Sequence, residues 1–219
     1  MTSLHFRILC LHGYRQDSTA MRLKMGGFRK AFKKSEFIYV DAPNIVPGED
    51  LSNGKSLSWF NNCSDGSFKY DANGSPEGFD NSCKILDDCL AKNGRFDIIL
   101  GFSQGASMAA LYIAKRSLEG RIPFKAAILV SGFISNVEAL QYLSQQDISI
   151  PSFHVYSKND NIIPPSASEE FMERFCKSRV LIHEGGHGFP SGSILKPAIG
   201  EFFEWVTLLT EEESSSYAS

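Results

Sequence analysis

The sequence of 219 residues contains no apolar run of the roughly 18–20 residues that a membrane-spanning helix requires. It also has no excess of basic residues, because its formal net charge is -3, whereas proteins that bind nucleic acid usually carry a basic face. The stretch Met1–Gly13 lacks a basic segment followed by a long apolar one, which argues against a signal peptide. These absences lead us to expect no stable membrane insertion and no nucleic-acid partner.

Cysteine is scarce and shows no pairing pattern. The five cysteines are odd in number and include no C-x-x-C spacing, which fits a reduced, intracellular setting better than a disulfide framework. We therefore expect a cytoplasmic location, with the nucleus as an additional one. Nothing in the composition indicates an oligomeric state.

What the sequence does contain is an alternation of short apolar runs with segments of helical spacing. Several runs are almost continuously apolar, which is typical of strands buried on both faces of a parallel sheet. The alternation predicts an α/β fold, with a mostly parallel central sheet and helices on both of its faces. The expected strands are Arg7–Leu11, Phe37–Val40, Asp97–Leu100, Ala126–Val130, Ser152–Tyr156 and Arg179–Ile182. The expected helices are Met21–Phe32, Phe79–Ala91, Gln104–Leu118, Ser166–Lys177 and Ile194–Leu209.

Two segments depart from this alternation. Residues 43–78 are rich in Pro, Gly, Ser, Asn and Asp, yet they include Trp59 and Phe60. A loop of this length inside a compact domain is usually functional or disordered. Residues 210–219 are acidic and polar, and we expect them to form a disordered tail. The sequence thus predicts a single domain over residues 1–209 with an insert-like loop at 43–78.

A G-x-S-x-G motif, Gly101–Gly105, lies between an apolar run and a segment rich in small residues. A serine nucleophile needs a tight, strained turn between a strand and a helix, and glycines on either side remove Cβ atoms that would clash there. The N-terminus of the following helix favours negative charge at the same place. We interpret Ser103 as a catalytic nucleophile, and the alternative is an ordinary serine in a strand-helix turn.

Acyl transfer builds negative charge on the former carbonyl oxygen, and fixed backbone N–H donors stabilise that charge. One donor is expected to be the amide of Gln104, the residue after the nucleophile. The second is expected from the loop after the first strand, where Gly13 permits close approach and the N–H of Tyr14 is the candidate. In that loop we interpret His12 as a structural histidine, with direct catalysis as the alternative. Arg15 is interpreted as a loop-bracing charge, with substrate binding as the alternative.

In hydrolases with such a turn, a carboxylate and then a histidine follow the serine along the chain. Asp160 comes after the expected strand Ser152–Tyr156, where a carboxylate can orient an imidazole and stabilise its charged form. His187 comes after the expected strand Arg179–Ile182. The order Ser103, Asp160, His187 fits a catalytic triad. As a plain loop residue, Asp160 would instead be a turn former.

The segment from His183 to His187 also reads H-E-x-x-H, which binds zinc when both rings project from one helical face. The pair Gly185–Gly186 lies between the histidines, and two glycines cost a helix about 2 kcal/mol relative to alanine. We therefore expect no metal site, and a zinc hydrolase is the rival interpretation. His183 is expected at a strand end or on the surface, Glu184 is expected to be a loop charge, and His154 a core histidine.

The sequence resembles the FSH family of serine hydrolases in five motifs, over about residues 6–207: L-H-G-Y-R-Q, G-F-S-Q-G-A, L-V-S-G-F, D-N-I-I-P and E-G-G-H-G-F-P. The resemblance implies an α/β-hydrolase fold, a triad of Ser103, Asp160 and His187, and hydrolysis of carboxylic esters without a metal or organic cofactor. The family is similar to small carboxylesterases and acyl-protein thioesterases. Trp59 and Phe60 match an aromatic pair common in the family, although the surrounding loop differs.

We therefore expect a serine esterase that acts on a small-molecule acyl ester, with the 43–78 loop near its active site. An apolar pocket wall would favour medium- to long-chain acyl groups over acetate, and core packing is the alternative role for each candidate wall residue. The candidates, besides Tyr14, are Trp59, Phe60, Phe102, Phe133, Ile162 and Phe189. The rival functions are an acyl thioesterase, which uses the same triad, and a non-catalytic binding module on the same fold.

Overall fold

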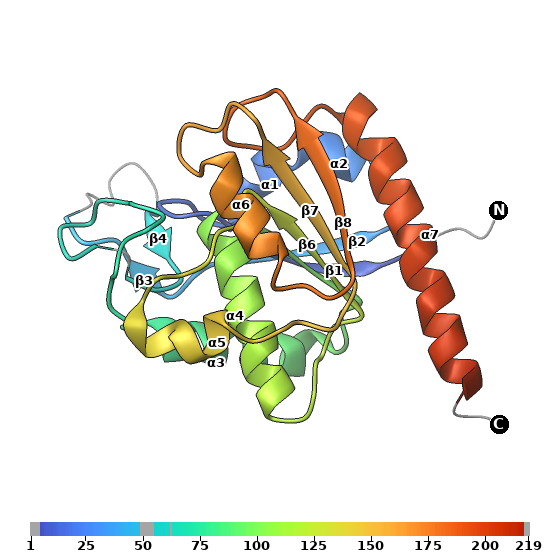
Figure 1. Ribbon diagram of the computed structural model, residues 1–219, viewed down its shortest axis with the longest axis horizontal. Coiled ribbons are helices and arrows are strands. Elements are labelled where there is room, and N and C mark those ends of the chain that lie inside the picture. The colour runs from blue at the N-terminus through green and yellow to red at the C-terminus, as the bar shows by residue number, and fades with distance from the viewer. Residues whose placement is uncertain (1–4, 49–54, 62, 217–219) are drawn as a thin grey trace.

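The computed structural model describes residues 5–48, 55–61 and 63–216 (Figure 1). Its centre is a six-stranded sheet, parallel throughout, in the order β2-β1-β5-β6-β7-β8. The strands are β1 (Arg7–Leu11), β2 (Glu36–Val40), β5 (Ile98–Phe102), β6 (Ala126–Val130), β7 (Ser152–Ser157) and β8 (Ser178–His183). All six expected strands are present and their ends lie within two residues of the predicted ones. The predicted α/β architecture with a parallel sheet is confirmed.

Helices cover both faces of the sheet because successive strand residues point to opposite sides. Leu9 and Ile99 belong to one apolar cluster, whereas Ile8 and Ile98 belong to the other. The first cluster is covered by α3 (Phe79–Asn93), α4 (Gln104–Leu118), α5 (Gln141–Ser144) and α6 (Pro165–Met172), with a short 3-10 helix at Glu138–Leu140. The second is covered by α1 (Ser18–Lys24), α2 (Gly26–Ala31) and α7 (Gly192–Ser216).

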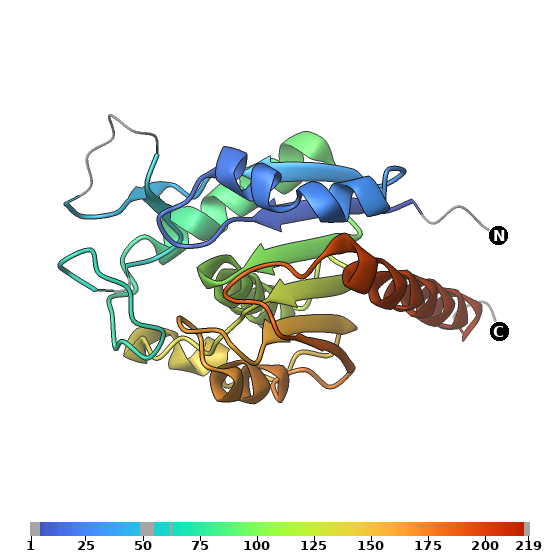
Figure 2. The same cartoon turned by 90° about the horizontal axis from the view of Figure 1, so that it is seen from above.

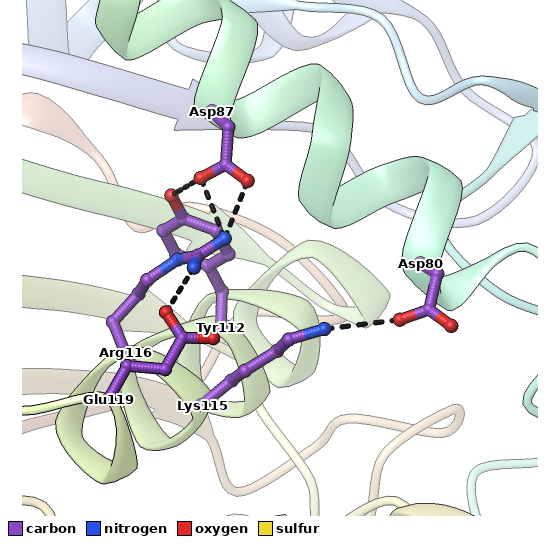
Figure 3. Close-up of polar contacts among 6 residues, drawn as sticks. All are labelled: Asp80, Asp87, Tyr112, Lys115, Arg116 and Glu119. Atoms are coloured by element: carbon purple, nitrogen blue, oxygen red, sulfur yellow. Dashed lines mark hydrogen bonds and ion pairs between the residues drawn. The ribbon is translucent and has the colours of Figure 1, made fainter.

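Helix α4 runs through the interior of the protein. Twelve of its fifteen residues are buried, and small side chains such as Ala106 and Ala109 let it lie close to the sheet. Near its C-terminal end the buried Arg116 forms an ion pair with Asp87 of α3, which also accepts a 2.7 Å hydrogen bond from the hydroxyl of Tyr112 (Figure 3). Glu119 is a second partner of Arg116. This network fixes α4 against α3, and it holds the helix whose other end carries the turn at Ser103.

Three segments differ from the expected elements. The helix expected over Met21–Phe32 is two helices, because the chain turns at Met25, ahead of two glycines that disfavour a continuous helix. Helix α6 ends at Met172, before the expected end. Within the 43–78 segment, β3 (Asn44–Ile45) and β4 (Leu57–Ser58) form a short antiparallel ribbon that the sequence pattern does not predict.

The expected disordered tail is partly wrong, because α7 continues to Ser216. Its N-terminal half is held against the sheet by a buried apolar stripe that includes Leu195 and Phe202. Glutamate is a good helix former, so the acidic residues that follow extend a helix already in place. The part of the predicted tail at 217–219 lies outside the described residues.

The described parts of the 43–78 segment gather at the end of the molecule toward which the strands point (Figure 2). Helix α7 extends toward the opposite end (Figure 2). Two parts of the insert are held together by the side chain of Asn44, whose Nδ2 donates to the carbonyl oxygens of Ser58 at 3.0 Å and Trp59 at 3.2 Å. Among the described helices, none combines the length and apolarity needed to cross a bilayer.

Candidate active site

Ser103 lies on a strained turn between β5 and α4, with backbone φ 54° and ψ -120°. Positive φ is uncommon for a residue with a Cβ atom, and such strain is found preferentially at functional sites. The flanking glycines are required by close packing. A Cβ on Gly101 would lie 2.3 Å from the carbonyl oxygen of Gly105, and one on Gly105 would lie 2.5 Å from that of Leu11. The predicted context of Ser103, a buried strand before it and a helix after it, is confirmed.

His187 and Asp160 form a hydrogen-bonded pair. Nδ1 of His187 lies 2.7 Å from Oδ2 of Asp160, and the Asp160 side chain is only 1% exposed. The other carboxylate oxygen accepts hydrogen bonds from the backbone N–H groups of Ile162 and Ile163, both at 2.9 Å. Burial alone would raise the pKa of the Asp160 carboxyl, but these three hydrogen bonds outweigh it and hold that pKa below its ordinary value. The carboxylate is therefore charged at neutral pH, so it favours the tautomer with a proton on Nδ1 and leaves Nε2 free to accept one.

The H-E-x-x-H string is not a helix. Strand β8 ends at His183, and the residues up to Gly188 form bends. The ring of His183 turns back to accept a hydrogen bond from the N–H of Gly185 at 3.1 Å, and Glu184 pairs with Lys158 at 2.9 Å. The two histidine rings thus have separate partners. Nowhere in the described residues do three or more His, Cys, Asp or Glu side chains gather as a metal site would require.

The imidazole of His187 lies next to the turn that carries Ser103. Its ring centroid is 4.8 Å from that of Phe102, the residue before Ser103. Phe189 stacks on Phe102 from the same loop, at 5.7 Å. In the part of the chain that the structure describes, Oγ of Ser103 has no hydrogen bond with the imidazole, and catalytic hydrogen bonds are often long in unliganded enzymes. Ser103, Asp160 and His187 follow β5, β7 and β8, so they share one edge of the sheet.

The candidate oxyanion donors flank Ser103 on two loops. Gln104 is the first residue of α4, so its N–H has no acceptor within the helix. Its side chain points the other way and holds the insert: Oε1 accepts from the N–H of Trp59 at 3.0 Å, and Nε2 donates to the carbonyl oxygen of Phe60 at 2.8 Å. Tyr14 lies in the loop after β1. A Cβ on the preceding Gly13 would lie 3.0 Å from the Phe102 ring, so glycine lets this loop approach the turn.

The residues interpreted as structural have structural roles. His12 is buried, its Nδ1 lies 2.7 Å from the carbonyl oxygen of Gly13, and its Nε2 accepts from the N–H of Ala42 at 3.0 Å. His154 is buried in the core, where burial lowers its pKa to about 3. The guanidinium of Arg15 donates to the carbonyl oxygen of Gly66 at 3.0 Å. These three interpretations are confirmed.

The candidate pocket-wall residues differ in their exposure and in their distance from the turn at Ser103. Trp59 and Phe60 are 0% and 1% exposed and belong to the core on the α3–α4 face, so their prediction as pocket walls is wrong. The cause is the side chain of Gln104, which draws their backbone inward. Phe102 is buried behind His187, and Ile162 is 49% exposed beside Asp160.

The two remaining candidates lie on either side of the site. Phe189 is partly buried against Phe102, as described above, and Phe133 is buried after β6. Phe133 lines a cavity of about 20 Å³ under α5, which has room for about one water molecule and not for an acyl chain. Phe68 of the insert, which packs on Phe133 at 5.7 Å between ring centroids, was missed because its segment has the composition of a loop.

Comparison with known proteins places this chain in a family. The family model described as "Serine hydrolase (FSH1)" matches residues 1–198. The chain is 38% identical over 205 residues to Esterase CG5412 of Drosophila melanogaster, covering 90% of this chain and 73% of that protein. It is 34% identical over 225 residues to Esterase OVCA2 of Danio rerio, covering 93% of this chain and 99% of that protein.

Solved structures agree on the fold. The structure of esterase PE8 superposes with a TM-score of 0.62 at 24% identity, covering 94% of this chain and 92% of that one. The Bacillus cereus carboxylesterase superposes with a TM-score of 0.60 at 18% identity, covering 92% and 89%. The class that the sheet and the turn at Ser103 define is therefore the α/β-hydrolase fold, as the sequence predicts. Within that class the chain belongs to the FSH1 family of serine hydrolases, and it is an enzyme of the serine esterase type.

Proposed function

We propose that the enzyme hydrolyses carboxylic esters of medium to long acyl chains through a triad of Ser103, His187 and Asp160. The observation that carries the proposal is the 2.7 Å hydrogen bond between Asp160 and His187, at the sheet edge where Ser103 lies on its strained turn. A buried, charged carboxylate that fixes an imidazole beside a serine is the arrangement that general-base activation of a hydroxyl requires.

In this mechanism Nε2 of His187 takes the proton of Ser103 as Oγ attacks the ester carbonyl carbon. The oxyanion accepts hydrogen bonds from the backbone N–H groups of Gln104 and Tyr14. His187 then gives the proton to the leaving alcohol, and an acyl-enzyme remains on Ser103. Water, deprotonated by the same imidazole, hydrolyses the acyl-enzyme and restores the hydroxyl. The dipole of α4 favours the negative charge at its N-terminus throughout.

The preference for longer acyl groups rests on the apolar surface around the turn. Ile162 is half-exposed beside Asp160, and Tyr14 and Phe68 are partly buried, with their tilted rings 5.3 Å apart between centroids. Each buried methylene contributes about 0.8 kcal/mol, so an acyl chain that covers these side chains binds more tightly than acetate does.

The test is hydrolysis of p-nitrophenyl esters together with labelling by a fluorophosphonate probe. Ser103→Ala is expected to abolish both without changing the melting temperature by more than a few degrees. A matched control is Ser131→Ala, because Ser131 is also a buried serine with positive φ, 49°, at the end of the neighbouring strand β6. This control is expected to remain active. Labelling of Ser103→Ala at the wild-type rate would contradict the assignment.

We also propose a cytoplasmic location. All five cysteines lie in the described part of the chain and are free thiols, which is the usual state in a reducing compartment. Fractionation of cells that express the tagged protein tests this proposal, and recovery in the secreted fraction contradicts it.

A further inference from the structure

Three aromatic rings form a continuous line across the active-site edge of the sheet. The ring centroids of Tyr14 and Phe68 are 5.3 Å apart, and those of Phe68 and Phe133 are 5.7 Å apart. Tyr14 follows β1 and Phe133 follows β6, and in the sheet β5 lies between these two strands. The carboxyl ends of parallel strands meet at one edge of the sheet, so the line of rings spans the end of β5. That end carries Ser103.

Phe68 is fixed to the loop that follows β1. The carbonyl oxygen of Gly66 accepts hydrogen bonds from the hydroxyl of Tyr14 and from the guanidinium of Arg15, both at 3.0 Å. Gly66 has φ 76°, and a Cβ there would lie 2.2 Å from the carbonyl oxygen of Pro47, so no other residue fits without displacing the backbone. The segment therefore meets the candidate oxyanion loop in a defined position, and Phe68 is only two residues further along.

The three rings differ in what they can offer a substrate. Phe133 is 1% exposed, and Ser107 of α4 donates a 2.5 Å hydrogen bond to its carbonyl oxygen, which fixes it as a floor. Phe68 is partly buried: it packs on the cluster of Phe133, Ile163 and Ala167 and keeps part of its surface open. Phe68 is thus a ring of the insert that is supported from below and partly accessible, and it is the one in contact with Tyr14 among the described residues.

We propose that Phe68 is a specificity-determining residue, whose ring is the wall against which the acyl chain of the ester lies. The inference rests on the proposed function, with Ser103 as the nucleophile and the amide of Tyr14 as an oxyanion donor. A carbonyl oxygen bound at the Tyr14 amide places the first carbons of the acyl chain beside Tyr14. The next apolar surface along the line of rings is Phe68. An acetyl group is too short to reach it, whereas an octanoyl chain covers it.

The test compares kcat/KM for p-nitrophenyl octanoate and p-nitrophenyl acetate. In Phe68→Ala the octanoate-to-acetate ratio is expected to fall about tenfold, because the longer chain loses an apolar surface that the shorter one never covers. In Phe68→Leu, which keeps an apolar side chain, the ratio is expected to fall about threefold. The matched control is Tyr70→Ala. Tyr70 packs on the same cluster from the same segment, but among the described residues it has no ring contact with Tyr14, and its ratio is expected to stay within about twofold.

An unchanged or raised ratio in Phe68→Ala overturns the proposal. So does an equal fall in Tyr70→Ala, because it would show that loosening the segment, and not losing the ring, changes the preference. If Phe68→Ala does not fold, the Leu variant decides by the same criterion. Failure of the proposed function is a separate result: it is seen as an inactive wild type or an active Ser103→Ala. A Ser103-dependent wild type with an unchanged ratio in the Phe68 variants overturns only the role of Phe68.

Discussion

Replacing Asp160 by asparagine tests the proton relay, because it removes the negative charge of the carboxylate that accepts Nδ1–H of His187 and keeps the shape of the side chain. In the wild type, Oδ1 of Asp160 accepts two backbone N–H groups and Oδ2 accepts Nδ1–H of His187. An asparagine keeps its oxygen for the two backbone donors and turns its NH₂ group toward His187. Nδ1 must then accept a hydrogen bond, so the neutral ring carries its proton on Nε2. In that tautomer the lone pair is on Nδ1, and Nε2 has none to take the proton of Ser103.

The expected loss is large because the proton sits on the wrong ring nitrogen, Nε2, which must be free to act as the base. A wrong tautomer in a serine triad lowers kcat by about 10⁴-fold, and at about 1.4 kcal/mol per decade this is about 5 kcal/mol of transition-state stabilisation. The fold should change little, since the two backbone hydrogen bonds at 2.9 Å remain. The pKa of Asp160 lies below its ordinary value, so the wild-type carboxylate is charged above about pH 4. The kcat of Asp160→Asn is therefore expected to be below that of the wild type throughout pH 5 to 9.

The assay is the initial rate of p-nitrophenyl ester hydrolysis across that pH range, with thermal unfolding of each protein to verify its fold. Asp147→Asn is the matched control, because Asp147 is an exposed carboxylate ahead of β7 and far from the carboxyl end of that strand. Its rate is expected to equal that of the wild type. An Asp160→Asn protein that is folded and keeps more than a tenth of the wild-type kcat would refute the reasoning.

Three further predictions concern stability. Gly101→Ala is expected to lower the free energy of unfolding by about 2–3 kcal/mol through overpacking, since its Cβ would lie 2.3 Å from the backbone oxygen of Gly105. Gly200→Ala, whose Cβ would lie in open space within α7, is expected to raise that free energy by about 1 kcal/mol. Urea unfolding measures both changes. Ser103→Gly is expected to exceed Ser103→Ala in stability by about 1 kcal/mol, because only glycine relieves the positive φ, and equal melting temperatures would contradict this. Burial lowers the pKa of His154 to about 3, so the unfolded chain takes up a proton there as pH falls below 6.5 while the folded chain does not. Proton uptake at His154 in the unfolded chain should therefore lower the free energy of unfolding by about 2 kcal/mol as the pH falls from 7 to 5. In His154→Asn, urea titrations at the two pH values should show that this part of the pH dependence is lost.

The sheet and the turn at Ser103 could be predicted from the sequence because they depend on local patterns. β1, β6 and α4 begin and end where the apolar runs and small-residue spacing place them. The Asp160–His187 pair was also predictable, since each residue follows a strand of the same parallel sheet and the ends of such strands converge.

The insert could not be read in the same way, because its structure depends on contacts between distant parts of the chain. Trp59 is drawn into the core by a hydrogen bond to Gln104, 45 residues away, and Phe68 is positioned by residues near 14 and 133. Composition describes residues 43–78 as a loop but says nothing of these partners. The acidic end of α7 was missed for a related reason: its charge pattern suggests disorder, whereas the packed first half of the helix supports its extension.

The side chain of Gln104 separates the insert into a fixed root and an exchangeable outer part. Its two hydrogen bonds to the backbone of Trp59 and Phe60 secure the root, beside the amide proposed to hold the oxyanion. Gly66 is held by Tyr14 and Arg15 and Gly78 by Asn44, so the residues between these anchors, from Ser67 to Glu77, are candidates for grafting as a cassette. Libraries that vary this cassette while keeping the root should yield enzymes with altered ester selectivity and an undisturbed catalytic centre.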